Sequence, residues 1–376
     1  MRILFLVALL LGGCASPPEI VGYYAGWKEA SVDASKLTVV NYAFVDMGWS
    51  VSGRDADNLR KLAALKSRHS HLRLVASIGG WTSSQGFSDM ASDSGARAAF
   101  TTGAIAFMRR YDFDGVDIDW EYPGAIGVPC EKPRTCERPE DKRNFVTLAR
   151  EMRRAFDAAG LADRRQYLLT IAAGIDRKYL YDQGSAAWMR ELAAVVDWVN
   201  LMTYDYHGTW ENAAGFLAPL GRDPADPSEG NVMDSVDSYL REGVPAGKLL
   251  LGLPFYGKGW GGCTAPYQPC SGPLADPPEA TFEFGMLIDE GYLTADADGN
   301  HTVGGRGYRR HWNALAAAPY LYNPDTRTFI SYDDEVSTRQ KVRYARSKGL
   351  RGVMYWEIAA DRHGTLADVV SREWPR

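Results

Sequence analysis

Three carboxylic acids occupy alternate positions in the segment FDGVDIDWEYP, which covers residues 113–123. In an extended strand alternate side chains point to the same side, about 7 Å apart, so Asp117, Asp119 and Glu121 would share one face. The side chains between them are apolar or aromatic, which argues against a solvated run of charges. Closely spaced carboxylates resist joint ionisation, so at least one should keep its proton near neutral pH, as a general acid requires. A buried structural network of carboxylates is the alternative.

The same spacing restricts how these groups could act on a glycosidic bond. Glycosidases that use two carboxyl groups place them on opposite faces of the sugar, about 5 Å apart in retaining enzymes and further apart in inverting enzymes. Neighbours on one strand cannot easily flank a sugar ring. The nucleophile should therefore be another group, and the acetamido oxygen of an N-acetyl sugar is already attached to the substrate.

The elements that would position these residues alternate between short apolar runs and stretches of helical periodicity, as in βα units of a parallel sheet. The predicted strands are Ile20–Tyr24, Thr38–Val45, Arg73–Ile78, Gly115–Trp120, Leu168–Ala173, Trp198–Tyr204, Leu249–Pro254 and Gly352–Trp356. The predicted helices include Asp57–Arg68, Arg97–Arg110, Lys142–Ala159, Val232–Glu242 and Ser337–Lys348. Eight such units predict an α/β fold, a (β/α)8 TIM barrel, whose chemistry lies at the C-terminal ends of the strands, where Glu121 falls.

The interval between the seventh and eighth predicted strands is far longer than one helix requires. It is rich in Gly, Pro, Tyr and short strand-like pieces, and a structureless loop of this length is rare in a compact protein. We therefore predict a catalytic barrel formed by residues 19–258 and 332–376, with an inserted domain at 259–331.

The carboxylate segment resembles glycoside hydrolase family 18, whose signature Asp-x-x-Asp-x-Asp-x-Glu is met by Asp114, Asp117, Asp119 and Glu121. Other segments similar to the family are Ser77–Trp81, Met202–Asp205 and Met354–Glu357, which follow or close the third, sixth and eighth strands. The inserted segment resembles the extra α+β domain of bacterial chitinases. The resemblance spans nearly the whole mature chain. It implies a chitinase that hydrolyses β-1,4-linked N-acetylglucosamine polymers and oligomers by a retaining, substrate-assisted mechanism without metal or cofactor.

The resemblance also implies a role for each catalytic residue. Glu121 would protonate the leaving oxygen. Asp119, paired with Asp117, would hold the acetamido N–H while its carbonyl oxygen attacks and an oxazolinium ion forms. Tyr204 and Asp205 would orient the same acetamido group.

Further residues are expected to bind the substrate or to support the catalytic acids. They are Tyr23, Phe44, Ser77, Gly80, Trp81, Met202, Trp210, Tyr256, Lys258 and Trp356. By resemblance, Tyr23 and Ser77 would stabilise the charge on Asp117. Trp356 would stack beneath the distorted sugar. Trp81 and Trp210 would line the leaving-group side.

Some of these residues also have ordinary structural explanations. The hydroxyl groups of Tyr23 and Ser77 could simply satisfy buried polar groups. The Trp210 ring could cover a surface patch. His207, beside the predicted site, is more often a structural residue than an acid–base partner. Lys258 stands where many relatives have Arg in a Tyr-Gly-Arg sequence, and Lys lacks the planar two-pronged donor, which leaves a sugar contact there open.

The first residues have the features of an exported lipoprotein. Residues 1–13 read as a signal peptide, because a charged start precedes an apolar run too short to span a bilayer. Residues 11–14, Leu-Gly-Gly-Cys, resemble a lipobox, and 14–18 form a short linker. A lipidated Cys14 would anchor the enzyme to the bacterial cell envelope, at the outer membrane or cell surface. Without lipidation the protein would be periplasmic or secreted.

The other four cysteines form two close pairs, Cys130 with Cys136 and Cys263 with Cys270. An even count in an exported chain predicts disulfides. No His lies near either pair at zinc-finger spacing, so a structural metal is the weaker interpretation.

Composition restricts the partners. The net charge of -5, the pI near 5.8 and the lack of a long basic run argue against nucleic acid. We expect a monomer that binds chitin or chito-oligosaccharides and meets the membrane only through its lipid anchor. Two other functions stay open. A chitin-binding, lectin-like protein on this scaffold is disfavoured because Glu121 is present. An endo-N-acetylglucosaminidase acting on glycans or peptidoglycan is disfavoured by the inserted domain and by Met202–Asp205.

Overall fold

A computed structural model describes residues 17–125 and 127–375 of the chain. The predicted signal peptide and Cys14 lie outside the described residues. Within the described ranges, no helix combines the length and the apolar character needed to cross a bilayer.

Eight parallel strands close into a barrel in the order β1-β16-β7-β6-β5-β4-β3-β2. They are β1 Glu19–Ala25, β2 Val39–Val45, β3 Arg73–Gly79, β4 Gly115–Asp119, β5 Leu168–Ala173, β6 Trp198–Leu201, β7 Leu249–Pro254 and β16 Gly352–Trp356. The predicted (β/α)8 TIM barrel is confirmed. The sixth strand is shorter than predicted, because backbone bonds from Thr203 N to Leu201 O and from Tyr204 N to Met202 O turn the chain after Leu201.

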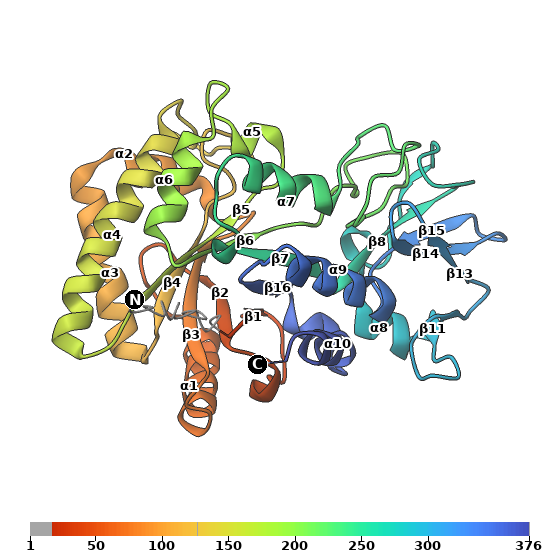
Figure 1. The fold of residues 1–376 in the computed structure, drawn as a ribbon, viewed down its shortest axis with the longest axis horizontal. Helices are drawn as coiled ribbons and strands as arrows, with labels where there is room; N and C mark the ends of the chain where they lie inside the picture. Colours follow the sequence, from red (N-terminus) through yellow and green to blue (C-terminus); the bar gives the residue numbers. More distant parts are fainter. Residues whose placement is uncertain (1–16, 126, 376) are drawn as a thin grey trace, which may run out of the picture.

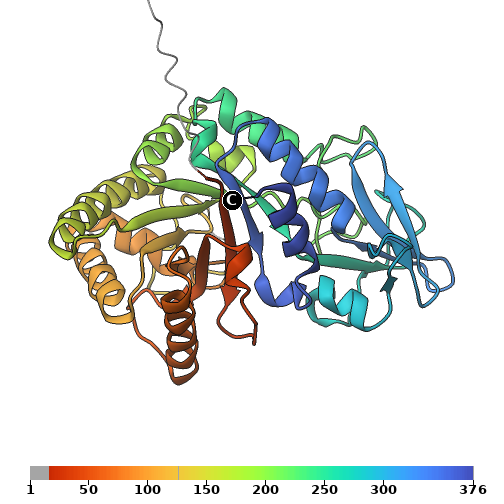
Figure 2. The ribbon, with the colours of Figure 1, turned by 60° about the horizontal axis from the view of Figure 1, so that its bottom comes forward.

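Helices surround most of the barrel (Figures 1 and 2). They are α1 Gly53–Arg68, α2 Phe87–Ser92, α3 Ser94–Tyr111, α4 Asp141–Asp163, α5 Arg177–Leu180, α6 Ala187–Val195, α7 Val232–Arg241, α9 Glu335–Ser347 and α10 Thr365–Glu373. Short 3₁₀ helices lie at η1 Ala34–Lys36, η2 Ser84–Gly86, η3 Ala246–Lys248, η4 Pro278–Ala280 and η5 Ile358–Asp361.

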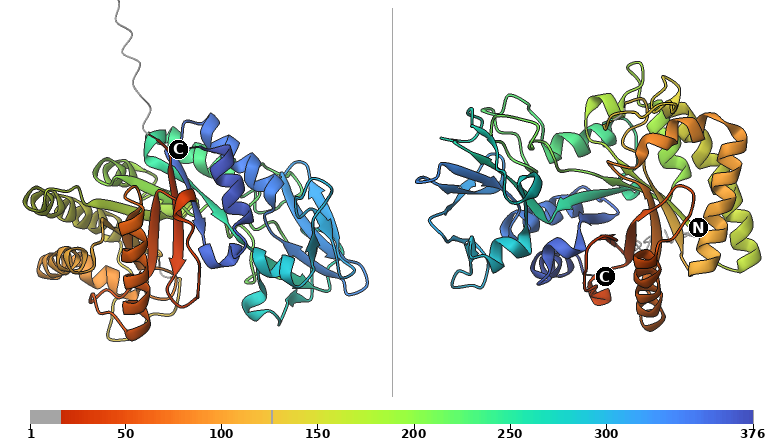
Figure 3. Two further views of the ribbon diagram at one scale, coloured as in Figure 1. Left: turned by 90° about the horizontal axis from the view of Figure 1, so that it is seen from below. Right: turned by 180° about the vertical axis from the view of Figure 1, so that it is seen from behind.

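The inserted domain lies beside the barrel, as the views from below and behind both show (Figure 3). Its strands are β8 Tyr256–Gly261, β9 Gly272–Pro273, β10 Thr281–Glu283, β11 Leu293–Thr294, β12 Val303–Gly304, β13 Arg309–Asn313, β14 Ala318–Asn323 and β15 Thr328–Ser331, and its helix is α8 Phe284–Asp289. The main sheet has the order β10-β8-β15-β14-β13. The strand β8 belongs to this sheet and begins at Tyr256, three residues before the predicted start of the domain at residue 259, which stays a prediction. Disulfides join Cys130 to Cys136 and Cys263 to Cys270.

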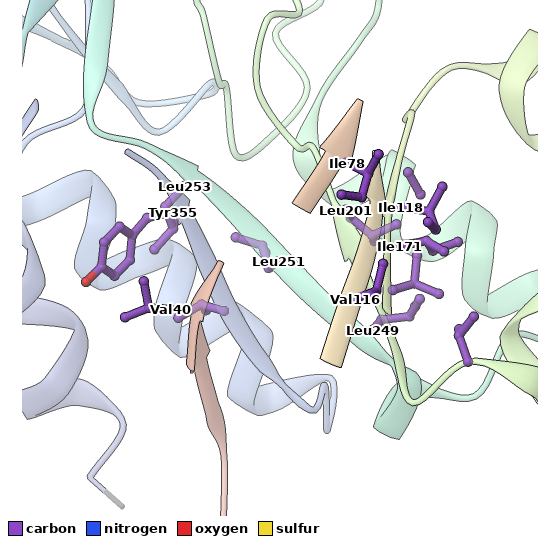
Figure 4. Packing of buried hydrophobic residues seen from close by; sticks show 14 of the residues in the cluster. Val40, Ile78, Val116, Ile118, Ile171, Leu201, Leu249, Leu251, Leu253 and Tyr355 are labelled. Carbon is purple, nitrogen blue, oxygen red and sulfur yellow. The ribbon is translucent and has the colours of Figure 1, made fainter. Parts of the chain in front are cut away.

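The alternation along β4 divides its side chains between two environments. Val116 and Ile118 pack into the large apolar cluster between strands and helices, where Ile78 and Ile171 also lie (Figure 4). Asp117 therefore points to the barrel interior with the other odd-numbered residues of the strand. The apolar face of β4 thus fixes the register that brings the carboxylates inward.

Candidate active site

Asp117 is buried inside the barrel and accepts four hydrogen bonds. The Tyr23 hydroxyl (2.9 Å) and Ser77 Oγ (2.8 Å) donate to Oδ2, while Thr170 Oγ1 (2.6 Å) and Asn200 Nδ2 (3.1 Å) donate to Oδ1. Tyr23 and Ser77 thus contact Asp117, the residue whose charge they are predicted to stabilise. Sequence reasoning missed the other two donors. Their signal was a single polar residue at an inward position of an otherwise apolar strand.

Asp119, the next inward residue, is buried and its Oδ1 has no hydrogen-bond partner. Burial raises the pKa of both aspartates. At Asp117 four hydrogen bonds oppose that rise, whereas at Asp119 the neighbouring charges of Glu121 and Asp117 raise the pKa further. Of the two aspartates, Asp119 is therefore the one whose charge most needs a proton or a hydrogen-bond donor nearby.

Glu121 follows β4 and is half-buried at the mouth of the barrel. Burial raises its pKa to about 7, which suits a general acid near neutral pH. Its backbone N–H donates to Ser84 Oγ (2.9 Å), and that hydroxyl donates to the carbonyl oxygens of Gly80 (2.9 Å) and Asp119 (3.1 Å). Ser84, which the sequence did not single out, thus ties the acid to the exit of β3.

The two glycines at the exit of β3 allow a close approach of neighbouring groups. Gly79 has φ +112° and Gly80 has φ +79°, conformations that favour glycine. A Cβ on Gly79 would lie 2.1 Å from the Asp119 carbonyl oxygen, and one on Gly80 would lie 2.4 Å from the Phe44 ring. Gly80 therefore leaves space for the aromatic ring above it.

Aromatic rings cover the adjoining part of the barrel mouth. The Trp356 ring lies with its centroid 5.7 Å from Tyr23, 5.8 Å from Phe44 and 6.1 Å from Trp27. Trp27 stacks on Phe44 at 6.1 Å and is 51% exposed. Sequence reasoning missed Trp27, although its place after Gly26 at the exit of the first strand was a signal. A hollow of about 360 Å³ beside these rings is lined by Gly26, Trp27, Phe44, Ser52, Arg54 and Asp55.

The two tryptophans predicted for the leaving-group side are both exposed. Trp81 is 51% exposed and Trp210 is 63% exposed. Each ring lies across a glycine, Gly127 and Gly208 respectively, at which a Cβ would come within 2.2 Å of the ring. Apolar rings open to solvent are available for stacking on sugars.

The loop after β6 supplies the residues predicted to hold the acetamido group. Tyr204 is buried and its hydroxyl contacts Met354 Sδ at 4.0 Å, while Met202 packs against the same interior cluster. Asp205 accepts a hydrogen bond from the Tyr256 hydroxyl at 2.7 Å. Tyr256 belongs to β8, so the inserted domain contributes directly to this part of the site.

Lys258 and His207 are engaged within the protein. Lys258 Nζ donates to Thr281 Oγ1 (2.7 Å) and to the Glu279 carbonyl oxygen (3.3 Å), so both bonds lie within the inserted domain. A sugar contact by Lys258 stays a prediction. His207 is buried between Glu211 (2.6 Å) and Asp226 (2.9 Å), which identifies it as a structural residue of the loop after β6. Across the described residues, no group of three or more His, Cys, Asp and Glu is arranged to hold a metal ion.

A parallel barrel with a row of carboxylates at the end of its fourth strand and an aromatic mouth has the architecture of a glycoside hydrolase. The chain belongs to glycosyl hydrolases family 18, whose family model matches residues 19–361.

Individual relatives cover nearly the whole chain. Chitinase A1 of Niallia circulans is 36% identical and aligns with 95% of this chain, which spans 58% of that protein. Chitinase B of Serratia marcescens is 31% identical over 90% of this chain and 76% of its own length. The solved structure of chitinase ChiA74 from Bacillus thuringiensis is similar with a TM-score of 0.83 and 33% identity, over 95% of this chain and 70% of that one.

A family 18 N-acetylglucosaminidase from Paenibacillus barengoltzii is similar at a TM-score of 0.80 and 34% identity, over 95% of this chain and 99% of that one. The chain spans less than two thirds of the first curated relatives it matches, at 58% of Chitinase A1 and 28% of Chitinase ChiA from Flavobacterium johnsoniae.

Proposed function

We propose that this protein is a chitinase that hydrolyses β-1,4-linked N-acetylglucosamine by a retaining, substrate-assisted mechanism. The observation that carries the proposal is the unequal bonding of the two aspartates. Both oxygens of Asp117 accept hydrogen bonds from four donors, whereas Asp119 Oδ1 has no partner. A buried acceptor without a partner is costly unless a ligand supplies a donor. The acetamido N–H of the substrate is a donor of the required kind.

The reaction then follows from the placement of the acid. Protonated Glu121 gives its proton to the glycosidic oxygen, and the bond from that oxygen to C1 breaks. The acetamido oxygen of the same sugar attacks C1 from the opposite face, which forms an oxazolinium ion whose N–H faces Asp119. Water then attacks C1 and gives a proton to the Glu121 carboxylate while the bond from C1 to the acetamido oxygen breaks, so the acetamido group is restored and the product is released as the β anomer.

The test is turnover of chito-oligosaccharides by wild type and by Glu121→Gln. The substitution keeps the size and polarity but removes the transferable proton, so we expect a folded protein that binds oligomers and turns over at least about a hundredfold more slowly. Proton NMR of fresh product reports the anomer. Release of the α anomer, or efficient cleavage next to a de-N-acetylated sugar, would overturn the mechanism. Greater activity on a glycoprotein or on peptidoglycan would overturn the substrate.

Release of single sugars is the second candidate function, because the match to the N-acetylglucosaminidase named above covers almost the full length of both proteins. Product lengths from chitohexaose separate the two. A chitinase yields oligomers or dimers early in the reaction, whereas an N-acetylglucosaminidase yields the monomer throughout.

The proposed location is the bacterial cell envelope, through a lipid on Cys14. The support is the Leu-Gly-Gly-Cys sequence after a short apolar run. Labelled fatty acid should enter the wild-type protein and not Cys14→Ser. Unlabelled wild-type protein free of membranes would contradict the anchor and leave the catalytic proposal untouched.

A further inference from the structure

The Lys28 side chain joins three separate segments at one side of the barrel mouth. Its Nζ donates to Glu357 Oε1 at 2.8 Å and to Glu283 Oε1 at 2.6 Å. Lys28 follows β1, Glu357 follows β16, and Glu283 ends β10 of the inserted domain. The Glu357 side chain is 3% exposed, and the side chains of Lys28 and Glu283 are 32% and 25% exposed.

Two of these charged residues adjoin an aromatic residue of the candidate site in the chain, and the third pairs with one across a strand ladder. Lys28 follows Trp27 in the chain, and Glu357 follows Trp356, whose rings lie 6.1 Å apart. Glu283 pairs with Tyr256 in the ladder between β10 and β8. Tyr256 in turn donates its hydroxyl hydrogen to Asp205 at 2.7 Å. One ammonium group therefore joins the segments that carry Trp27 and Trp356 to β10, the strand that pairs with Tyr256 of β8.

The energetics of the Lys28 ion pairs favour a role in positioning the neighbouring segments over a role in stability. Burying an ion pair costs desolvation that can exceed the attraction between the charges, so the pair of Lys28 with the buried Glu357 is weak evidence for a role in stability. The two carboxylates have other partners as well. Glu357 Oε2 accepts from the Ala359 N–H (2.9 Å) and Glu283 Oε2 accepts from Arg362 (2.9 Å). Among the described residues, these bonds do not join Glu357 to Glu283, whereas Lys28 does.

We propose that Lys28 is a positioning residue for substrate binding: by contacting Glu357 and Glu283 together, it fixes Trp27, Trp356 and Tyr256 relative to one another. This inference rests on the proposed chitinase function. It concerns the binding of sugars and not the proton transfer, because the Glu121 backbone is bonded by Ser84 and the Asp117 carboxylate by four donors, none of which is Lys28.

The first experiment measures kcat and KM on chitohexaose for Lys28→Met and Lys28→Arg. The Arg variant keeps a charge able to reach both carboxylates, so its constants should stay near those of wild type. The Met variant should raise KM about tenfold with kcat within a factor of two, because the loss of sugar contacts that are equal in the ground and transition states raises KM and leaves kcat unchanged. Partial unfolding would instead lower the apparent kcat and leave KM unchanged.

Because Lys28→Met leaves a buried carboxylate without its cation, a second variant removes both charges. The Lys28→Met, Glu357→Gln double variant should recover thermal stability and yet keep the raised KM. A double variant with wild-type KM would overturn the proposal.

Glu283→Gln tests the link to the inserted domain without exposing the buried pair. Its matched control is Glu151→Gln, since Glu151 is 28% exposed and bonds Arg97 at 2.8 and 3.0 Å on the outside of the barrel. We expect KM to rise for Glu283→Gln and to stay unchanged for Glu151→Gln. Equal KM values for the two variants would overturn the inference. If wild type itself fails to cleave chitohexaose, it is the proposed function that fails.

Discussion

The carboxylates of Asp117, Asp119 and Glu121 have different hydrogen-bond surroundings, although burial raises the pKa of each. Asp117 has four donors, Asp119 Oδ1 has none, and Glu121 is half-buried with a pKa raised to about 7. The motif identified these three residues because spacing on a strand is visible in the sequence. It did not identify Thr170 or Asn200, because pairing across a barrel depends on strand register, which a single strand does not reveal.

The raised pKa of Glu121 predicts how both activity and stability change with pH. The acid must be protonated to act, so kcat/KM should fall as pH rises through about 7. In the folded state the carboxyl binds its proton more tightly than in the unfolded chain, so stability is lost as pH rises from the unfolded pKa towards 7. Glu121→Gln should therefore melt at a higher temperature than wild type at pH 8. This difference should vanish near pH 4, and a constant difference across that range would contradict the assignment.

Thr170→Val tests the bonding of Asp117 without changing the size of the side chain. The variant loses the 2.6 Å hydrogen bond to Oδ1, and fewer donors to a carboxylate raise its pKa further. The acidic limb of the kcat/KM profile should move to higher pH by about one unit. Thr147→Val is the control, because that hydroxyl bonds only a helix carbonyl at the surface. If the acidic limb of the kcat/KM profile stays at the wild-type pH in Thr170→Val, the ionisation of Asp117 does not determine that limb.

At the scale of elements, the missing side chain of Gly79 at the exit of β3 lets β3 and β4 approach each other closely. Hydrophobic periodicity predicted the eight barrel strands, since each strand buries an apolar face. It extended the sixth strand to Tyr204, because a turn made of backbone bonds within an apolar run has no pattern in the side chains. Trp27 and Ser84 were likewise missed, because Trp27 lies in a turn and Ser84 begins the short 3₁₀ helix η2, and the course of both segments depends on tertiary contacts.

Gly79→Ala tests the close approach of β3 to the Asp119 carbonyl oxygen of β4. The added Cβ meets the Asp119 carbonyl oxygen at 2.1 Å, and φ is +112°. We expect a loss of about 1 to 3 kcal/mol in the free energy of unfolding, together with reduced kcat, because β4 must shift. Gly247→Ala, where a Cβ meets nothing within 4 Å, should leave both unchanged. Urea unfolding and steady-state kinetics measure the two effects, and equal behaviour of the variants would contradict this account.

At the scale of the whole molecule, the inserted domain contacts the loop after β6 at the barrel mouth. The length of one interval between strands predicted that this domain exists, but it did not predict these contacts. Tyr256 bonds to Asp205, and the disulfide loop 263–270 packs on the loop after β6 through backbone bonds from Tyr267 N to Ala214 O and from Cys270 N to Asn212 O, both 2.7 Å. Such contacts between segments far apart in sequence leave no local signal.

The disulfide loop therefore supports the segment that carries Trp210. Replacing Cys263 and Cys270 by Ser removes a short cross-link, which on chain-entropy grounds lowers stability by about 2 to 3 kcal/mol. It should also speed hydrogen exchange at residues 208–216, because the cross-linked segment packs on this loop and donates backbone hydrogen bonds to the Asn212 and Ala214 carbonyl oxygens, so that its loosening opens the loop. KM for substrates long enough to reach Trp210 should rise more than KM for a chromogenic dimer.

The Cys130 and Cys136 pair offers the matched control for this last prediction. Its cross-link spans a sequence separation of 6, against 7 for the other pair, so the entropic loss should be similar. Its loop contacts α2, where Thr135 N donates to Asp89. The Ser variant of this pair should therefore lose stability while exchange at 208–216 keeps its wild-type rate. Faster exchange there in both double variants would mean that the loop after β6 responds to general destabilisation, and the supporting role of the inserted domain would be wrong.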